Sequence, residues 1–279
     1  MRKLSPESDK LSEYIEKRPD YGQRIHITAS FRRHAIPDKD PESGMSLDKL
    51  APAGVEQAKN IGKGVGEGAG QQDKKIKVFA SGKSRAKETG QNIMGEAAEQ
   101  AEIINQNLGD GKYEIKGKQE LETITLGNEA KRLVKEKGYN GFIEEWLNRK
   151  DLSDGSTTPE QAATGLASRV DLYRRMSKLL KNDSDVLIEN ITHGPSPDAF
   201  IAEVAQVKDK DGKALEGYEK IKELGGVFQP SDNFEINMER TTPDQEPTLS
   251  LSFRGGKLDI DQERFNELVA KYEERKTKE

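Results

Sequence analysis

Two histidines and two arginines stand at places where a folded chain could bring them into one site. Arg33 and His34 follow the alternating run RIHITASF, and His193 follows the apolar run DVLIENIT. Arg85 comes a few residues after a third apolar run, IKVFAS. An arginine fork matches the oxygens of a phosphate group, and a neutral imidazole can attack phosphorus. These four side chains therefore predict a site for phosphoryl chemistry.

The elements that would position these residues alternate between strands and helices. Strands are predicted at 24–31, 76–81, 185–193, 234–240 and 248–253, and helices at about 50–65, 84–100, 158–181, from 197 and from 261. Such alternation predicts an α/β fold with helices on both faces of a sheet. Ligands in such sheets bind beyond the carboxyl ends of the strands. We therefore expect the two histidines and two arginines to converge there.

The remaining segments predict one domain with two additions. Residues 1–22 are highly charged and predict an arm, and residues 23–279 predict a single domain. The irregular region of about 101–157 predicts a partial cap over the site, with a strand near 113–115 and a helix near 142–147. The tail beyond about residue 224 is expected to complete one edge of the sheet.

Two further segments carry turn signals. Residues 36–44 are rich in Pro, Asp and Gly and predict a turn. The glycines between Gly62 and Gly70 are expected to end the helix that begins near Leu50. Thr158 precedes Pro159 and predicts the N-cap of the next helix.

The composition narrows the classes of function. The chain has 279 residues, a net charge of −5 and no cysteine, which excludes disulfides, thiol catalysis and zinc bound by cysteine. An acidic chain gives no support to nucleic acid as a partner. No run of about 18 apolar residues is present, so we expect a soluble, cytoplasmic protein without a membrane partner. The sequence makes no prediction of the oligomeric state.

Four stretches of the chain resemble motifs of one family. SFRRHAIP resembles the first-strand Arg-His motif of the histidine phosphatase superfamily, and LAPAGVEQA resembles the helix start that follows it. VFASGKSRAKET is similar to the motif that carries the second arginine, and ITHG to the late His-Gly motif. The matching residues beyond the four named above are Leu50, Pro52, Gly54, Gln57, Ala58, Ser81, Ala86, Thr89 and Gly194. The motifs occur in the family's order.

The resemblance implies a fold, an activity and a set of site residues. The fold would be a three-layer α/β/α sandwich around a mostly parallel sheet, of the phosphoglycerate mutase-like type and in branch 1 of the superfamily. His34 would be the nucleophile that carries the phosphoryl group, and Arg33, Arg85 and His193 would complete the phosphate pocket. The substrate would be a phosphorylated small molecule or a phosphoprotein. No cofactor and no metal are implied.

The chain departs from the family in two ways. The residue after the nucleophile is Ala35, where most members have Gly. The general acid usually lies in a Leu-x-Glu stretch before a glycine, and here Glu122 stands one residue from the usual spacing to Gly127. We favour Glu122 as a catalytic residue, with Glu120 as the alternative. Most glutamates are solvent-exposed carboxylates without a catalytic role, and this interpretation is open for Glu122 and Glu120.

Three functions are open at this point. The first is a phosphatase that hydrolyses a phosphomonoester or phosphohistidine through a phosphohistidine on His34. The alternatives are a phosphosugar mutase of the phosphoglycerate type and a non-catalytic relative that binds phosphate. Residues 36–39 do not resemble the corresponding stretch of the mutases.

The residues argue against two other interpretations, a P-loop and a metal site. A P-loop around Gly82-Lys83-Ser84 would need a glycine at Lys77. A metal site would need histidines closer together and no arginines beside them. His26 lies inside the first strand, and we expect it to be structural.

Overall fold

A seven-stranded sheet forms the centre of the computed structural model, which describes residues 20–42, 46–149, 152 and 154–278. The strands, in spatial order, are β4 (Lys75–Ala80), β7 (Asp185–Thr192), β1 (Ile25–Arg33), β9 (Asn233–Arg240), β10 (Thr248–Phe253), β11 (Gly256–Ile260) and β8 (Ala205–Gln206). β4, β7 and β1 form a parallel core, and the strands from β9 onward add antiparallel neighbours. The sheet is therefore mixed, and the strands that lead to the predicted site residues lie in its parallel part.

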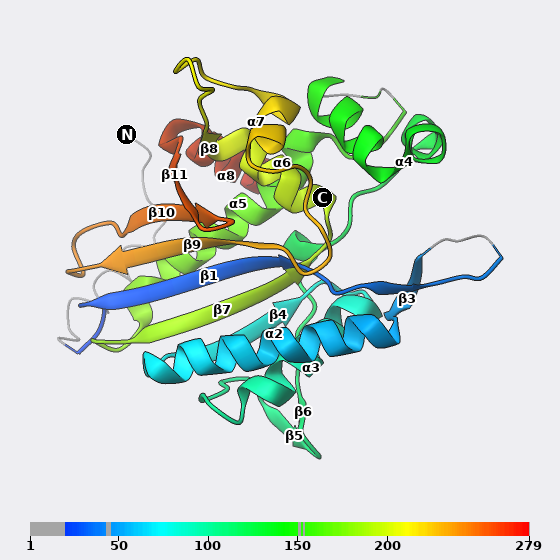
Figure 1. The fold of residues 1–279 in the computed structure, drawn as a ribbon. Coiled ribbons are helices and arrows are strands. Elements are labelled where there is room, and N and C mark those ends of the chain that lie inside the picture. Colours follow the sequence, from blue (N-terminus) through cyan, green and yellow to red (C-terminus); the bar gives the residue numbers. More distant parts are fainter. Residues whose placement is uncertain (1–19, 43–45, 150–151, 153, 279) are drawn as a thin grey trace.

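Helices cover the sheet on both faces, as the alternation of elements predicts (Figure 1). On one face lie α2 (Pro52–Gln71) and α3 (Ser84–Ala97); on the other lie α5 (Pro159–Met176), α6 (Pro195–Val204) and α8 (Gln262–Lys276). The shorter elements are η1 (Gln119–Leu121), η2 (Ser177–Leu179), α7 (Gly217–Glu223), and two hairpins, β2 (Pro37–Lys39) with β3 (Ser46–Leu50) and β5 (Asn107–Gly109) with β6 (Lys112–Tyr113). The α/β sandwich expected from the sequence is confirmed.

The core on the α5 and α6 side is built around stacked phenylalanines. Phe234 of β9 stacks on Phe31 of β1 at 5.0 Å and on Phe200 of α6 at 5.1 Å between ring centroids. All three rings are fully buried. Burial of such side chains contributes roughly 1.5–3 kcal/mol each. The stack joins the parallel and antiparallel parts of the sheet to the helix that begins just after His193.

The glycines of α2 do not end the helix, and that prediction is wrong. Gly62 and Gly66 lie one helical turn apart on the buried face that packs against α3. A methyl group on Gly66 would lie 2.8 Å from Cα of Ala97, and one on Gly62 would lie 2.5 Å from the carbonyl oxygen of Ile93. The missing side chains let the two helices approach closely. This gain in packing outweighs the low helix propensity of glycine.

The close approach predicts opposite effects for two glycines of the same helix. Gly66→Ala should lower the free energy of unfolding by about 2 kcal/mol, because the new methyl group overlaps backbone atoms. Gly64→Ala should raise it by up to about 1 kcal/mol, because a methyl group there meets no atom within 4 Å and alanine favours the helix. Urea unfolding of the two variants checks this. Changes of the same sign in both would contradict the packing described.

The segments around the site differ from their predictions in detail. Residues 36–44, predicted as a turn, begin with β2, which pairs with β3. The predicted helix near 142–147 is part of the longer α4 (Asn128–Arg149), which is kinked at Gly138, where φ is 71°. The predicted strand near 113–115 is the short β6. Apolar periodicity is weak in these polar segments, so their full lengths could not be predicted.

The predictions for the N-terminal arm and for the C-terminal tail agree with the structure only in part. Most of the predicted arm, residues 1–19, lies outside the described residues. Residues 20–22 contact the turn before β7, where Gly22 N donates to Leu180 O at 2.9 Å. At the other end, the tail extends the sheet through β9 and β10 and through β11, which was not predicted, but the edge itself is formed by β8 and not by the tail. Thr158 forms the predicted cap with Gln161.

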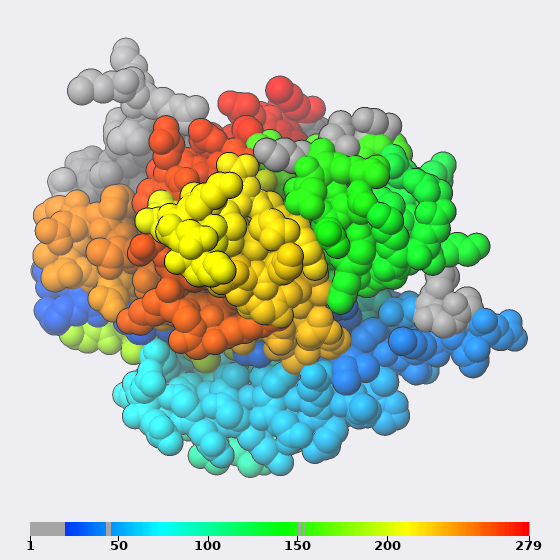
Figure 2. Space-filling model, turned by 45° about the horizontal axis from the view of Figure 1, so that its top comes forward, coloured from blue at the N-terminus to red at the C-terminus, as the bar shows by residue number. Residues whose placement is uncertain are grey.

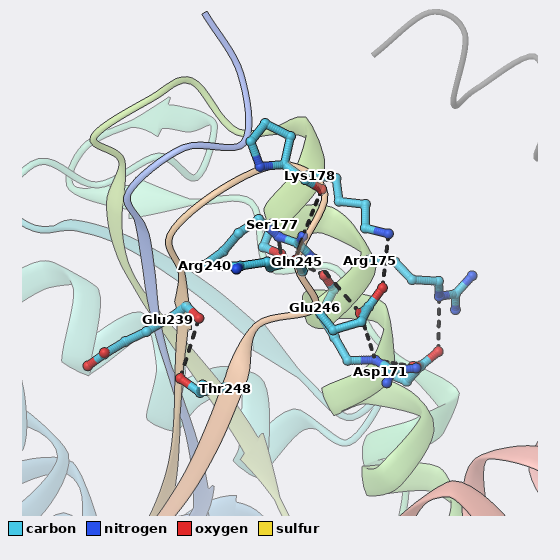
Figure 3. Close-up of polar contacts among 11 residues, drawn as sticks. Asp171, Arg175, Ser177, Lys178, Glu239, Arg240, Gln245, Glu246 and Thr248 are labelled. Carbon is cyan, nitrogen blue, oxygen red and sulfur yellow. Dashed lines mark hydrogen bonds and ion pairs between the residues drawn. The ribbon is translucent and has the colours of Figure 1, made fainter. Parts of the chain in front are cut away.

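The buried side chain of Arg240 lies at the end of the sheet where β1 begins, opposite to the carboxyl end of β1 (Figure 3). Nε of Arg240 donates to Oγ of Ser177 at 2.7 Å, and Nη1 donates to the carbonyl oxygens of Pro243 and Gln245. Glu246 lies 3.9 Å from its Nη2. These contacts fix the turn between β9 and β10 to the end of α5. These contacts are structural, because they lie where β1 begins. The predicted site follows Arg33, at the opposite end of that strand.

Candidate active site

The predicted site residues meet in one cavity at the carboxyl end of the parallel strands. Arg33, His34, Arg85 and His193 all line this cavity, whose volume is about 270 Å³. Figures 1 and 2 show α4, in green, and the β2–β3 hairpin, in blue, at this end of the molecule. Both elements contribute residues to the cavity wall. The segment predicted as a cap therefore supplies part of the wall.

His34 is held with one ring nitrogen free to act as a nucleophile. It lies just beyond β1 and is 4% exposed. Its Nδ1 lies 2.8 Å from the carbonyl oxygen of Ala35. Because a carbonyl only accepts, Nδ1 must carry the proton, and Nε2 keeps its lone pair. The ring meets that of His193 edge-on, with 5.1 Å between centroids.

The surroundings keep His34 unprotonated. The pKa of His34 is lowered to about 4, mainly by burial; the hydrogen bond to Ala35 opposes this shift, and the charges of Arg85 and Arg33 add to it. Burial is also the main cause that lowers the pKa of His193 well below its ordinary value, with the charges of His34 and Arg85 adding to it. Both imidazoles are therefore neutral at physiological pH, the state that a nucleophile requires.

The low pKa of His34 makes the fold sensitive to acid. In the unfolded chain the imidazole takes up a proton near pH 6.5, whereas in the folded chain it does so only near pH 4. Stability is therefore lost as the pH falls from 6.5 to 4. His34→Asn should remove up to about 3 kcal/mol of that loss. Urea unfolding of both proteins at several pH values in this range checks it, and parallel curves would contradict the burial of a neutral His34.

Motif residues of α2 and α3 hold the loop that follows His34. Oγ1 of Thr89 accepts a hydrogen bond from Ala35 N at 3.1 Å, and Oε1 of Gln57 accepts one from Ile36 N at 3.1 Å. Gly54 packs directly on the carbonyl of Ile36, where any side chain would clash. Two helices thus fix the two residues after His34. This gives a physical reason for the Gly, Gln and Thr of the motifs.

His193 is positioned by residues that follow β4. Its Nε2 lies 2.8 Å from Oγ of Ser81, and its Nδ1 lies 3.5 Å from Nη2 of Arg85. Since a guanidinium only donates, Nδ1 accepts and Nε2–H donates to Ser81. Ser81 belongs to a motif, but no separate role was predicted for it. The structure identifies it as the residue that orients the second histidine.

Arg33 and Tyr139 bring unsatisfied polar atoms to the cavity. The guanidinium of Arg33 lies over the ring of Tyr139 at 4.9 Å and donates to the carbonyl of Phe228. Nε of Arg33, Nε of Arg85 and Oη of Tyr139 are buried and have no hydrogen-bond partner among the described residues. Burial is the main cause that raises the pKa of Tyr139, so its hydroxyl keeps the proton. The residues that line the cavity with the two histidines therefore carry three donors that lack an acceptor among the described residues.

Asp48 is a second residue that sequence reasoning missed. Its carboxylate oxygens accept hydrogen bonds from Ser84 N at 3.2 Å and Arg85 N at 3.4 Å, at the start of α3. The carbonyl of Leu47 accepts from Nη1 of Arg85 at 3.3 Å. The hairpin thus holds Arg85 by both its backbone and its side chain. A single Asp in a polar, turn-like stretch carries no signal for this role.

The two candidate acids lie beside the cavity and do not line it. The carboxylate of Glu122 accepts a hydrogen bond from Gly82 N. Glu122 and Glu120 both line a neighbouring hollow, whereas the next residue, Thr123, lines the cavity of the histidines. No carboxylic acid is among the described residues that line this cavity. The identity of the general acid therefore stays a prediction.

The third histidine of the chain lies away from the cavity. His26 lies at the start of β1, with Nδ1 2.9 Å from Oδ1 of Asp185, and it does not line the cavity. Within the described ranges, no group of three or more carboxylates and histidines is placed to hold a metal ion. No helix in the described part of the chain is long and apolar enough to cross a membrane.

This fold and the position of the cavity define the phosphoglycerate mutase-like α/β class. Solved structures of this class match over most of the chain. Mycobacterial glucosyl-3-phosphoglycerate phosphatase is 14% identical, with a TM-score of 0.53, over 82% of this chain and 98% of its own. Phosphoglycerate mutase from Bacillus anthracis is 15% identical, with a TM-score of 0.50, over 84% and 95%. YhfR of Bacillus stearothermophilus is 13% identical, with a TM-score of 0.50, over 82% and 96%.

The sequence itself is distant from these proteins. No family model matches the chain, and no curated protein matches it. The likeness therefore establishes the fold, as the four motifs predict.

Proposed function

We propose that this chain is a histidine-type phosphatase that hydrolyses a phosphomonoester, or a phosphohistidine, through a phosphohistidine on His34. One observation carries the proposal: a neutral, buried imidazole with a free Nε2 lines the same cavity as Arg33, Arg85 and Tyr139, whose three buried donors have no acceptor among the described residues. A phosphoryl group supplies the acceptors that these donors lack. It also supplies the atom that a neutral imidazole attacks.

Each residue then has a defined part in the reaction. Nε2 of His34 attacks phosphorus, and the bond to the leaving oxygen breaks. Arg33 and Arg85 bind the equatorial oxygens, where charge must be stabilised in the transition state. Water then attacks the phosphohistidine and releases phosphate, which returns His34 to its neutral form. His193 completes the pocket beside Arg85.

The direct test is hydrolysis of para-nitrophenyl phosphate by the full chain. Release of nitrophenol and phosphate in equal amounts, inhibited by vanadate, is expected. An absence of turnover at all pH values between 5 and 8 would contradict the hydrolase. Incubation with 3-phosphoglycerate separates the mutase, which would form the 2-isomer without net release of phosphate.

A non-catalytic phosphate-binding relative is the second candidate. The observation that favours it is the lack of a carboxylic acid among the described residues that line the cavity. Such a protein would bind vanadate and form no phosphohistidine. The cytoplasmic location and a phosphorylated small molecule or phosphoprotein as substrate stay predictions from the sequence.

A further inference from the structure

The cavity of the histidines has one charged side and one apolar side. Arg33, Arg85 and the two histidines form the charged side. The rest of the wall is mainly apolar and comes from α4, from the segment after η1, and from two prolines. These apolar residues are Ile124, Leu126, Val134, Phe142, Pro37 and Pro195. A bound phosphomonoester would therefore place its phosphate among charges and its leaving group among apolar side chains.

The cavity offers little to a polar leaving group. Beyond the charged side, its polar side chains among the described residues are three hydroxyls, on Ser46, Thr123 and Tyr139. A phosphate would occupy both arginines, and no third cation is among the described residues that line the cavity to bind a carboxylate on the same substrate. Burying an unpaired polar group costs about 1–3 kcal/mol, and an unpaired charge costs more. Phosphoglycerates and phosphosugars are disfavoured by this wall.

The size and the missing acid narrow the substrate further. A volume of about 270 Å³ holds a phosphate and a compact group, such as a single ring. No carboxylic acid is among the described residues that line the cavity, so the wall itself places no carboxyl group to protonate the leaving oxygen. A leaving group of low basicity departs without one. Phenols, with a pKa of about 10, fit this requirement better than aliphatic alcohols.

We infer that the substrates of this site are phosphate monoesters of compact, apolar phenols, whose ring packs against Leu126, Val134 and Phe142. The inference rests on the proposed function and names its substrate class. Nε2 of His34 forms the bond to phosphorus while the phosphorus–oxygen bond breaks, and the electron pair leaves on the phenolate. Water then displaces the imidazole, and the proton that water gives up neutralises the phenolate.

The test compares three phosphate esters on the full chain: phenyl phosphate, butyl phosphate and 3-phosphoglycerate. We expect kcat/KM to fall in that order, with butyl phosphate at least about 10-fold above 3-phosphoglycerate, as one unpaired polar group demands. The comparison of butyl phosphate with 3-phosphoglycerate matters most, because both have alkyl leaving groups and differ in polarity. Equal values for that pair, or a preference for 3-phosphoglycerate, would overturn the inference and leave the phosphatase standing. No hydrolysis of any ester would instead refute the proposed function.

A substitution on the apolar wall sharpens the test. Val134→Lys should lower kcat/KM for phenyl phosphate about 10-fold and raise it for 3-phosphoglycerate by a similar factor, by supplying a cation for the carboxylate. Asn140→Lys adds the same charge at an exposed position of α4 that does not line the cavity, and it should change neither value. An identical effect of the two variants would overturn the assignment of the wall. Inhibition of the unaltered chain by phenylphosphonate and phosphonoacetate gives a measurement independent of the variants, and the phenyl compound should bind more tightly.

Discussion

His34→Asn should lower the turnover of an aryl phosphate by at least about four orders of magnitude, because it removes the group that forms the covalent intermediate. Asparagine retains a polar group of similar reach, so the buried surroundings of His34 are disturbed little. Its amide cannot supply the unprotonated ring nitrogen that Nε2 of His34 presents. The loss should appear in kcat, and vanadate should still bind.

The chain offers a matched control for this variant. His26 lies on the same strand, at the end away from the cavity, and contacts Asp185. His26→Asn should leave kcat/KM within a factor of about three, since a substitution away from the site changes free energies by roughly 0.5 kcal/mol. Turnover retained in His34→Asn, or lost equally in both variants, would refute His34 as the nucleophile.

Arg85→Gln should lower kcat/KM by about 10²–10³, the usual cost of losing one donor to the charge of a transition state. Arg85 contributes a guanidinium that reaches His193 on one side and Leu47 of the hairpin on the other. It also contributes a buried Nε without a partner among the described residues. Arg85→Lys should restore little, because an ammonium cannot bind two phosphate oxygens as a fork does.

Lys87→Gln is the control for Arg85, because it removes one positive charge from the same helix outside the cavity. Its kcat/KM should stay close to that of the unaltered chain at physiological salt. Steady-state kinetics with para-nitrophenyl phosphate measure all three variants. If Lys87→Gln and Arg85→Gln lose activity equally, the effect is one of general charge and not of a phosphate-binding fork.

The strands and the site histidines could be predicted because their signals are local. β1, β4 and β7 are short, apolar runs bounded by polar turns, and the rule that ligands bind at their carboxyl ends places His34 and His193 together. Arg33 and Arg85 were predicted from the same positions. All four line the cavity.

The features that could not be predicted depend on contacts between distant segments. Glycine generally ends a helix, and only the neighbouring helix α3 explains why Gly62 and Gly66 continue α2. Tyr139, which lines the cavity, and Asp48, which holds the start of α3, lie in polar segments without periodicity, so nothing in the sequence indicates either role. Glu122 is one residue from the family spacing, and in the structure its carboxylate contacts Gly82 N while Thr123 lines the cavity.

Detection of a phosphorylated chain tests most directly whether His34 is the nucleophile. The full chain is mixed with para-nitrophenyl phosphate, denatured at alkaline pH during turnover, and measured by intact mass spectrometry. We expect the added mass of one phosphoryl group, located on His34 by fragmentation, lost after brief acid treatment and missing from His34→Asn. Turnover without this species, or an acid-stable phosphate on another residue, would contradict His34 as the nucleophile.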